Sequence, residues 1–171
     1  MEIERKFTIK RLPENLEQYE KKEIEQGYLC TKPTVRIRKS NENYILTYKS
    51  RIGMEEKPDE VALTCEEIEL PLTKEAYEHL KVKIDHHLIS KTRYLIPLKD
   101  GLKVELDVFQ GNLKGLVYAE VEFPNEEAAA TFEIPDWFRN DVSFDKRFKN
   151  TFLSEVASLE EIDYNEVFGF M

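Results

Sequence analysis

Met1-Glu2-Ile3-Glu4-Arg5-Lys6-Phe7 opens the chain, and Glu2, Glu4 and Lys6 occupy every second position of this stretch. In a β-strand successive side chains point to opposite faces, so these three residues would share one face. Two carboxylates one strand repeat apart can hold a hard divalent cation, and the ammonium group beside them can hold an oxygen of a bound anion. The alternative is a charged strand face in contact with water.

The composition is that of a single globular domain rich in charge. The chain has 171 residues, of which 41% are hydrophobic and 35% are charged. We therefore expect one domain over residues 1–171, with a helical segment from about residue 150. The sequence contains no long apolar run and no apolar targeting segment after Met1, so we expect a cytoplasmic protein that does not interact with membranes.

The charge balance limits the kinds of partner. The formal net charge is -9, which leaves no long basic face to follow a nucleic-acid backbone, so we expect no nucleic-acid partner. A local basic pocket could still bind a small anion. Cys30 and Cys65 have neither the number nor the spacing of a disulfide scaffold or a metal finger, and we interpret them as reduced thiols.

Period-two runs and turn residues predict eight strands, over residues 1–7, 22–30, 34–39, 44–51, 61–70, 88–96, 102–109 and 117–123. A short helical turn is predicted at 12–17, and helices at 73–82 and 126–132 with Thr73 and Asn125 as N-caps. A last helix is predicted through Phe152, Val156 and Leu159, with a loose tail over 165–171. Residues 53–59 form a charged loop.

Most predicted strands have one apolar face and one face of mixed charge. The acids on the charged faces are Glu2, Glu4, Glu67, Glu69, Glu105, Asp107, Glu120 and Glu122. The bases are Lys6, Arg36, Arg38, Lys49, Arg51, Lys91, Arg93 and Lys103. If the helices cover the apolar faces from outside, the charged faces turn inward. This predicts an α+β fold, an antiparallel eight-stranded β-barrel or tunnel with a charged lumen.

The alternative architecture is a sandwich or open sheet whose charged face lies in water. The residue types favour the barrel. The charged faces are dominated by Arg and Glu, with few Ser, Thr or Gln, and in an enclosed lumen such charges have to pair with each other or with a charged ligand.

The ordered set of motifs resembles the CYTH superfamily, the triphosphate tunnel metalloenzymes. The motifs are Glu2-x-Glu4-x-Lys6, Val35-Arg36-Ile37-Arg38, Leu46-Thr47-Tyr48-Lys49, Glu67-Ile68-Glu69, Lys91-Thr92-Arg93, Val104 to Phe109 with Gly111, and Glu120-Val121-Glu122. Gln26-Gly27-Tyr28-Leu29 and the segment from Trp137 to Arg147 point further to the bacterial branch that hydrolyses inorganic tripolyphosphate. The resemblance covers residues 1 to about 150.

The resemblance implies a triphosphate and a divalent metal, Mg²⁺ or Mn²⁺, bound in the tunnel. It implies a hydrolase for inorganic tripolyphosphate. A class IV-type adenylate cyclase, a nucleoside or thiamine triphosphatase and a non-catalytic polyphosphate-binding module remain alternatives. Retention of the acids favours an enzyme, because binding alone would be helped by fewer of them. A homodimer is a further expectation, since dimers are common among bacterial relatives.

The candidate site residues follow from charge and from the resemblance. Phosphate contacts are expected from Lys6, Arg36, Arg38, Lys49 and Arg93, with Lys91, Arg51, Lys103 and Arg147 as secondary candidates. Metal ligands are expected among Glu2, Glu4, Glu122, Asp107 and Glu120. Lys6, Tyr28 and Glu120 are the catalytic candidates. Tyr28 is either a packing residue or, as the resemblance implies, the partner of Lys6.

Overall fold

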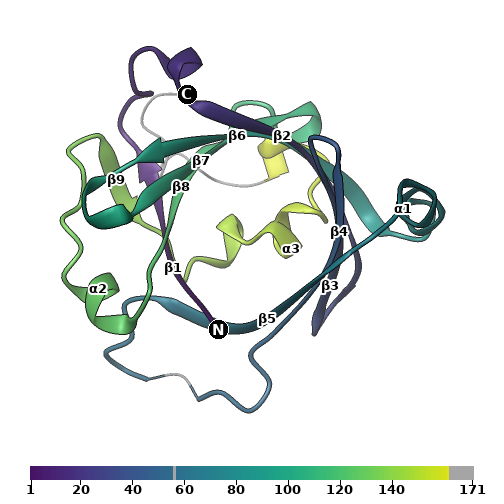
Figure 1. The fold of residues 1–171 in the computed structure, drawn as a ribbon, viewed down its shortest axis with the longest axis horizontal. Helices are drawn as coiled ribbons and strands as arrows, with labels where there is room; N and C mark the ends of the chain where they lie inside the picture. Colours follow the sequence, from purple (N-terminus) through teal and green to yellow (C-terminus); the bar gives the residue numbers. More distant parts are fainter. Residues whose placement is uncertain (56, 162–171) are drawn as a thin grey trace.

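A computed structural model describes residues 1–55 and 57–161, and its strands form a ring around a central axis (Figure 1). The strands are β1 (Glu2–Ile9), β2 (Glu20–Thr31), β3 (Thr34–Ser40), β4 (Asn43–Ser50), β5 (Leu63–Pro71), β6 (Asp85–Pro97), β7 (Lys103–Gln110), β8 (Val117–Glu122) and β9 (Phe138–Asp141). The α-helices are α1 (Lys74–Lys81), α2 (Glu126–Ala130) and α3 (Asn150–Leu153). Short 3₁₀ turns are η1 (Leu16–Gln18), η2 (Lys99–Gly101), η3 (Gly111–Leu113), η4 (Lys146–Phe148) and η5 (Leu159–Glu161).

The first eight strands close into an antiparallel barrel. Their order is β5-β4-β3-β2-β6-β7-β8-β1, and an additional pairing of β5 with β1 completes the ring. Glu4 shows the closure, because it lies opposite Glu122 of β8 on one side and opposite Leu63 of β5 on the other. The predicted eight-stranded barrel is confirmed, and the sandwich or open sheet is excluded.

The ninth strand was not predicted. One edge of β1 is taken by β8, so its other edge is shared: β5 pairs with Glu2 to Glu4, and β9 pairs with Phe7 and Ile9. β9 is only four residues long, and its sequence Phe-Arg-Asn-Asp has no alternation. It is a strand because β1 extends beyond the end of β5 and its exposed backbone groups need partners.

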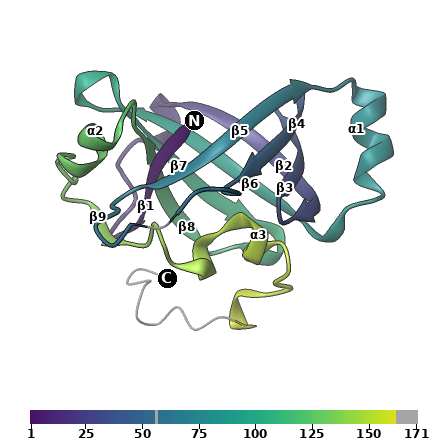
Figure 2. The same cartoon turned by 90° about the horizontal axis from the view of Figure 1, so that it is seen from below.

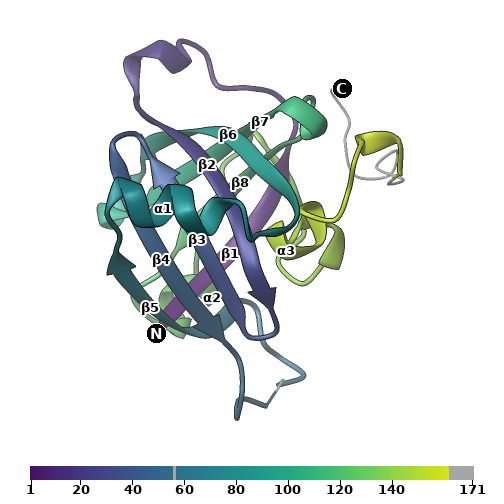
Figure 3. The same cartoon turned by 90° about the vertical axis from the view of Figure 1, so that its right-hand side faces the viewer.

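The helices α1 and α2 lie outside the barrel, as predicted, and Figure 3 shows α1 across the outer face of β3 and β4. Both predicted N-caps are confirmed. The Thr73 Oγ1 atom accepts a hydrogen bond from the Ala76 backbone N–H at 3.0 Å, and the Asn125 Oδ1 atom accepts one from the Ala128 N–H at 2.7 Å. These caps satisfy backbone donors that the first helical turn leaves free.

The predicted last helix is only partly correct. α3 ends at Leu153, and Leu159 belongs to the separate turn η5 instead of the same helix. The Ser154 hydroxyl donates to the Thr151 carbonyl at 2.6 Å, and such side-chain bonds to the backbone compete with helix continuation. The predicted loose tail over 165–171 lies outside the described residues. In the part of the chain that the structure describes, no helix is long and apolar enough to cross a membrane.

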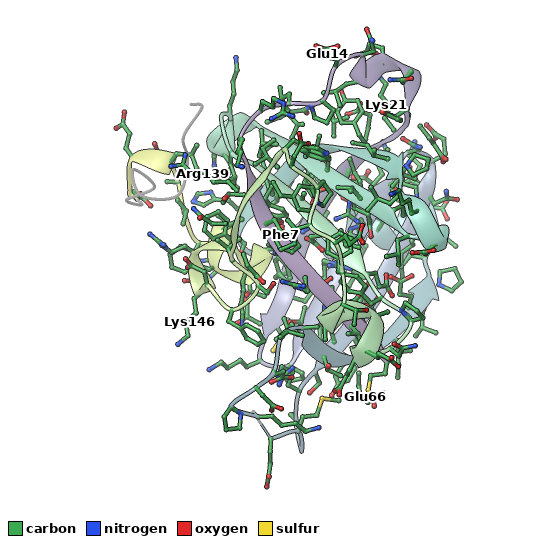
Figure 4. The ribbon with its side chains drawn as sticks, turned by 90° about the vertical axis from the view of Figure 1, so that its left-hand side faces the viewer. Phe7, Glu14, Lys21, Glu66, Arg139 and Lys146 are labelled. Atoms are coloured by element: carbon green, nitrogen blue, oxygen red, sulfur yellow. The ribbon has the colours of Figure 1, made fainter. Side chains whose placement is uncertain are left out.

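Two apolar clusters hold the barrel. The outer cluster lies between the barrel and α2 and is built on Phe7, Val104, Leu106, Val121 and Phe138. Figure 4 labels Phe7 on β1, seen from the side of the molecule where α2 and β9 lie. These residues supply the apolar face that the alternation required.

The inner cluster closes one end of the tunnel. Tyr28, Phe109 and Tyr118 point inward from their strands and pack against Phe148 and Leu153 of the C-terminal segment. Figure 1 shows α3 within the outline of the ring, and Figure 2 shows that it lies at one end of the barrel. The C-terminal segment therefore closes this end of the barrel, with the apolar cluster packed behind it and with Lys149, Asn150 and Thr151 at the surface of the cavity.

Candidate active site

The barrel encloses a cavity of about 760 Å³. Its wall includes most of the predicted site residues, namely Glu2, Glu4, Lys6, Tyr28, Arg36, Arg38, Lys49, Arg93, Glu120 and Glu122, together with Arg51, Lys103, Glu67, Glu69 and Glu105. The period-two pattern therefore identified the inward face correctly. Side chains that are far apart in the sequence meet here because every strand contributes alternate residues to the lumen.

One side of the cavity is crowded with carboxylates. Glu4 lies opposite Glu122 in the β1–β8 register, and burial together with the charge of Glu120 raises the pKa of Glu4 to about 8. Burial and a hydrogen bond to Glu2 raise the pKa of Glu67 to about 9. Glu4 and Glu67 therefore keep their protons at neutral pH, because their surroundings do not compensate a further negative charge.

Lys49 is the cation inside this acidic group. Its ammonium group is ion-paired with Glu2 and lies 3.7 Å from Glu4 Oε1. Burial alone would lower the pKa of Lys49, but Glu4 and Glu2 reverse the effect and raise it well above its ordinary value. Lys49 therefore compensates part of the charge that the carboxylates concentrate here.

The acidic group fits a hard divalent cation by its chemistry, because Mg²⁺ and Mn²⁺ prefer carboxylate oxygen donors and a bound cation would favour the ionised form of Glu4. Among the described residues, however, no three acidic, histidine or cysteine side chains already converge as a ready-made ligand group. Lys49 occupies part of the space between Glu2 and Glu4. A cation would therefore have to compete with this lysine.

The opposite side of the cavity holds two arginines with neutral partners. The Nη2 atom of Arg36 donates to the Thr47 hydroxyl at 3.2 Å. Arg38 donates from Nε and Nη2 to Gln26 Oε1, at 2.9 and 2.7 Å. In the described part of the chain, the buried Arg36 Nε has no hydrogen-bond partner. A buried donor without a partner is costly, and an anion in the cavity would satisfy it.

Arg93 is held differently, by carboxylates. Its guanidinium makes two hydrogen bonds to Asp107, at 2.7 and 2.9 Å, and an ion pair with Glu105 at 2.6 Å. Its charge is balanced by these acids, whereas the charges of Arg36 and Arg38 are not. The cavity therefore has one side with uncompensated positive charge and another side lined by carboxyl groups.

Lys91 and Asp107 do not line the cavity, contrary to the prediction that they contact phosphate and metal. Both side chains are fully buried, and their charged groups are 2.8 Å apart. Lys91 also donates to Asn150 Oδ1 at 3.3 Å, which connects it to the start of α3. The pair supports Arg93 from beneath the wall. The prediction was wrong because the period-two pattern gives the face on which a side chain lies but not how deeply it is buried.

Arg147 is also absent from the wall. It forms an ion pair with Asp145 at 2.6 Å within its own turn. The sequence placed it in a charged segment but gave no face, since this segment is not a strand.

Lys6 has a different aromatic neighbour from the one predicted. Its ammonium group donates to the Phe148 carbonyl at 2.6 Å, lies 3.6 Å from Glu120 Oε1, and stands 4.4 Å from the centre of the Tyr118 ring. The hydroxyl of Tyr28 accepts a hydrogen bond from Gln26 Nε2 at 3.3 Å. The structure therefore pairs Lys6 with Tyr118 and Glu120, while Tyr28 lines the cavity beside Gln26.

Three residues of the site were missed. Lys22 lines the cavity from β2, and its parity with Tyr28 could have identified it. Gln26 has the same parity but carries no charge, so a search for charges passed over it. Lys149 lies just before α3, where burial lowers its pKa and the nearby Lys6 and Arg51 add to the effect. Nothing periodic in the sequence marks Lys149.

The arrangement is a closed antiparallel barrel with facing acids and bases in its lumen, and residues 1–148 match the CYTH domain family. The chain belongs to the CYTH family. Dependence on a divalent metal is general among CYTH triphosphatases.

The relatives of this CYTH domain include inorganic triphosphatases. This chain is 38% identical over 157 residues to an inorganic triphosphatase of Nitrosomonas europaea, and the match covers 90% of this chain and 96% of the relative. A second inorganic triphosphatase, from Acetivibrio thermocellus, is 34% identical over 128 residues, 74% of this chain and 76% of the relative. The crystal structure of an inorganic triphosphatase superposes with a TM-score of 0.66 at 34% identity, covering 92% of this chain and 97% of the other.

Proposed function

We propose that this protein hydrolyses inorganic tripolyphosphate to pyrophosphate and orthophosphate with Mg²⁺ or Mn²⁺. The observation that carries the proposal is the division of one enclosed cavity into an arginine side, where Arg36 and Arg38 have neutral partners, and a carboxylate side around Glu4. Tripolyphosphate is a compact polyanion that needs both cationic contacts and a metal. Relatives that are named inorganic triphosphatases support this substrate.

The two sides of the cavity would have separate tasks. Arg36, Arg38 and Arg93 would contact phosphate oxygens, with Lys6 at the end closed by Phe148. Glu2, Glu4 and Glu122 would hold the metal, which supplies neutralisation of the phosphate oxygens when bound. Lys49, paired with Glu2 and Glu4, would then be released toward phosphate.

The reaction joins a water oxygen to a terminal phosphorus and breaks the bond to the bridging oxygen. Both water hydrogens end on the orthophosphate product, and the bridging oxygen leaves with pyrophosphate. Glu120 is proposed to orient the water, because Lys6, Arg93 and Lys91 overcome the effect of burial and hold the pKa of Glu120 well below its ordinary value. As a carboxylate it accepts hydrogen bonds at neutral pH. Lys6 and Tyr28 would stabilise the charge that develops on the phosphate.

Arg38→Ala tests the arginine side. We expect a loss of about 10²-fold in kcat/KM for tripolyphosphate, because the guanidinium has no acid to neutralise it and would contact phosphate in the transition state. Steady-state phosphate release, with circular dichroism to check the fold, measures the effect. Arg11→Ala removes an exposed arginine as a control. Wild-type kinetics in a folded Arg38→Ala protein would contradict the proposal.

A substrate panel tests the identity of the reaction. We expect a higher kcat/KM for tripolyphosphate than for ATP or thiamine triphosphate, since a compact triphosphate can place all its oxygens among the cavity cations. Pyrophosphate should be poor, because it reaches fewer of them. Phosphate release from each compound at one metal concentration gives the ranking. A tenfold preference for ATP or thiamine triphosphate would reject this substrate, and cyclic AMP as the product would indicate a cyclase.

A further inference from the structure

We propose that Gln26 is a positioning residue that orients Arg38 without neutralising it, so that the full positive charge of Arg38 remains available to a phosphate group. The inference rests on the proposed function, because it concerns how the same cavity binds a polyanion. It assigns a role to a neutral, buried residue that contacts two residues of the cavity wall, Arg38 and Tyr28.

The contact between Gln26 and Arg38 fixes the plane of the guanidinium. Gln26 lies in β2 directly opposite Arg38 of β3, and its side chain is fully buried. Its Oε1 atom accepts from two nitrogens of Arg38, Nε at 2.9 Å and Nη2 at 2.7 Å. Arginine has only donors, so the acceptor must be the amide oxygen. Two bonds to one group leave the guanidinium little freedom to rotate.

Arg93 provides the contrast within the same cavity. Asp107 holds the same two nitrogens of Arg93, Nε and Nη2, at 2.7 and 2.9 Å, but with its two carboxylate oxygens where Gln26 uses a single amide oxygen. The geometry is similar and the electrostatic result is opposite. Asp107 balances the charge of Arg93, whereas Gln26 leaves the charge of Arg38 unbalanced.

The second atom of the amide has a task that a carboxylate cannot perform. Gln26 Nε2 donates to the Tyr28 hydroxyl oxygen at 3.3 Å. The Tyr28 hydrogen is therefore directed away from Gln26, and Tyr28 lines the cavity. Only a group with one acceptor and one donor can receive from Arg38 and give to Tyr28 at the same time.

Among the described residues, Arg38 has its close side-chain hydrogen bonds to the neutral Gln26 and forms no ion pair with a carboxylate. Burial first, and then Arg36 and Arg93, lower the pKa of Arg38, and Asp107 and Tyr28 offset only part of this effect. Arg36 is held in the same neutral manner by the buried Thr47 hydroxyl, at 3.2 Å. The missing counter-charge is what an anionic ligand supplies.

Gln26→Glu is the decisive variant, because it keeps the size and the acceptor oxygen and adds one negative charge. We expect the Kd for inorganic tripolyphosphate, measured by calorimetry, and the KM for its hydrolysis to rise about tenfold or more. The thermal midpoint should stay equal or rise, since Arg38 gains an ion-pair partner. Gln18→Glu, on the exposed turn η1, makes the same change in net charge and should leave Kd and KM unchanged.

Gln26→Leu separates charge from packing. If Gln26 only filled space and satisfied hydrogen bonds, the Glu variant would bind normally and the Leu variant would be the damaged one. We expect a rise in KM for the Leu variant as well, because Arg38 loses its orientation, and this rise should disappear in an Arg38→Ala background. An equal rise in both backgrounds would overturn the proposal, and this comparison also decides the case in which the Glu variant does not fold.

The outcomes distinguish the inference from the function it rests on. A wild-type protein that neither binds nor hydrolyses tripolyphosphate with either metal rejects the proposed function. A wild-type protein that does both, with a folded Gln26→Glu variant of unchanged Kd and KM, rejects only the role of Gln26.

Discussion

Removal of divalent cations with EDTA is expected to reduce hydrolysis of tripolyphosphate by roughly 10³-fold or more, because a bound metal supplies several kcal/mol of charge stabilisation to phosphoryl transfer. Added Mg²⁺ or Mn²⁺ should restore the rate. Without the cation, Glu2, Glu4 and Glu122 bring no positive charge to the phosphate oxygens of the substrate. Phosphate release with and without chelator measures the effect.

Glu4→Gln assigns this requirement to the acidic side of the cavity. The amide keeps the shape and removes one charged ligand, so a loss approaching that caused by EDTA is expected, partly recovered at high metal concentration. Glu66→Gln is the matched control, since Glu66 is exposed and lies on the outer face of the same strand as Glu67 (Figure 4). Full activity in excess EDTA would exclude metal-assisted hydrolysis, and unchanged metal dependence of the Glu4 variant would place the metal elsewhere.

Asp107→Asn is expected to destabilise the fold by about 3–5 kcal/mol, because it leaves Lys91 and Arg93 buried without their shared counter-charge. All three charged groups lie beneath or at the wall, with Asp107 2.8 Å from Lys91 and 2.7 Å from Arg93. Such a loss is a large fraction of the roughly 5–15 kcal/mol that stabilises a typical domain. The urea midpoint of unfolding measures it.

Asp136→Asn is the control, since Asp136 pairs with Arg11 at 3.1 Å where both side chains are mostly exposed. Exposed pairs contribute about 0–1 kcal/mol, so little change is expected. Equal effects of the two substitutions would mean that the Lys91–Asp107–Arg93 group contributes no more than a surface pair.

The Asp107 carboxylate also predicts that the stability of the fold decreases in acid. Burial opposes ionisation of Asp107, but Arg93 and Lys91 outweigh it and lower its pKa below the ordinary value. The unfolded chain therefore binds a proton more readily than the folded protein does. The stabilisation is complete above about pH 4, the ordinary range of an aspartate, and is lost as pH falls through the lowered pKa. Unfolding free energies measured across this range should show a smaller pH dependence in Asp107→Asn.

The sequence alone determined which side chains share a face. Glu2, Glu4 and Lys6 lie on one face because a strand repeats every two residues, and the residue types and the family resemblance indicated that this face is the inner one. The N-caps Thr73 and Asn125 could also be predicted from the local sequence, since each cap accepts a hydrogen bond from a backbone N–H only three residues further along the chain. The resemblance to the CYTH family then supported the prediction that these strands form a closed barrel.

Only the tertiary structure decided which charges are balanced. Gln26 meets Arg38, and Asp107 meets Arg93, through cross-strand register, which residue spacing within one strand does not contain. The same register put Lys91 and Asp107 beneath the wall, and the C-terminal segment placed Lys149 at the cavity. Periodicity gives a face, whereas depth and partners depend on strands that are distant in the sequence. The difference between a neutralised arginine and an available one therefore appears only in the folded barrel.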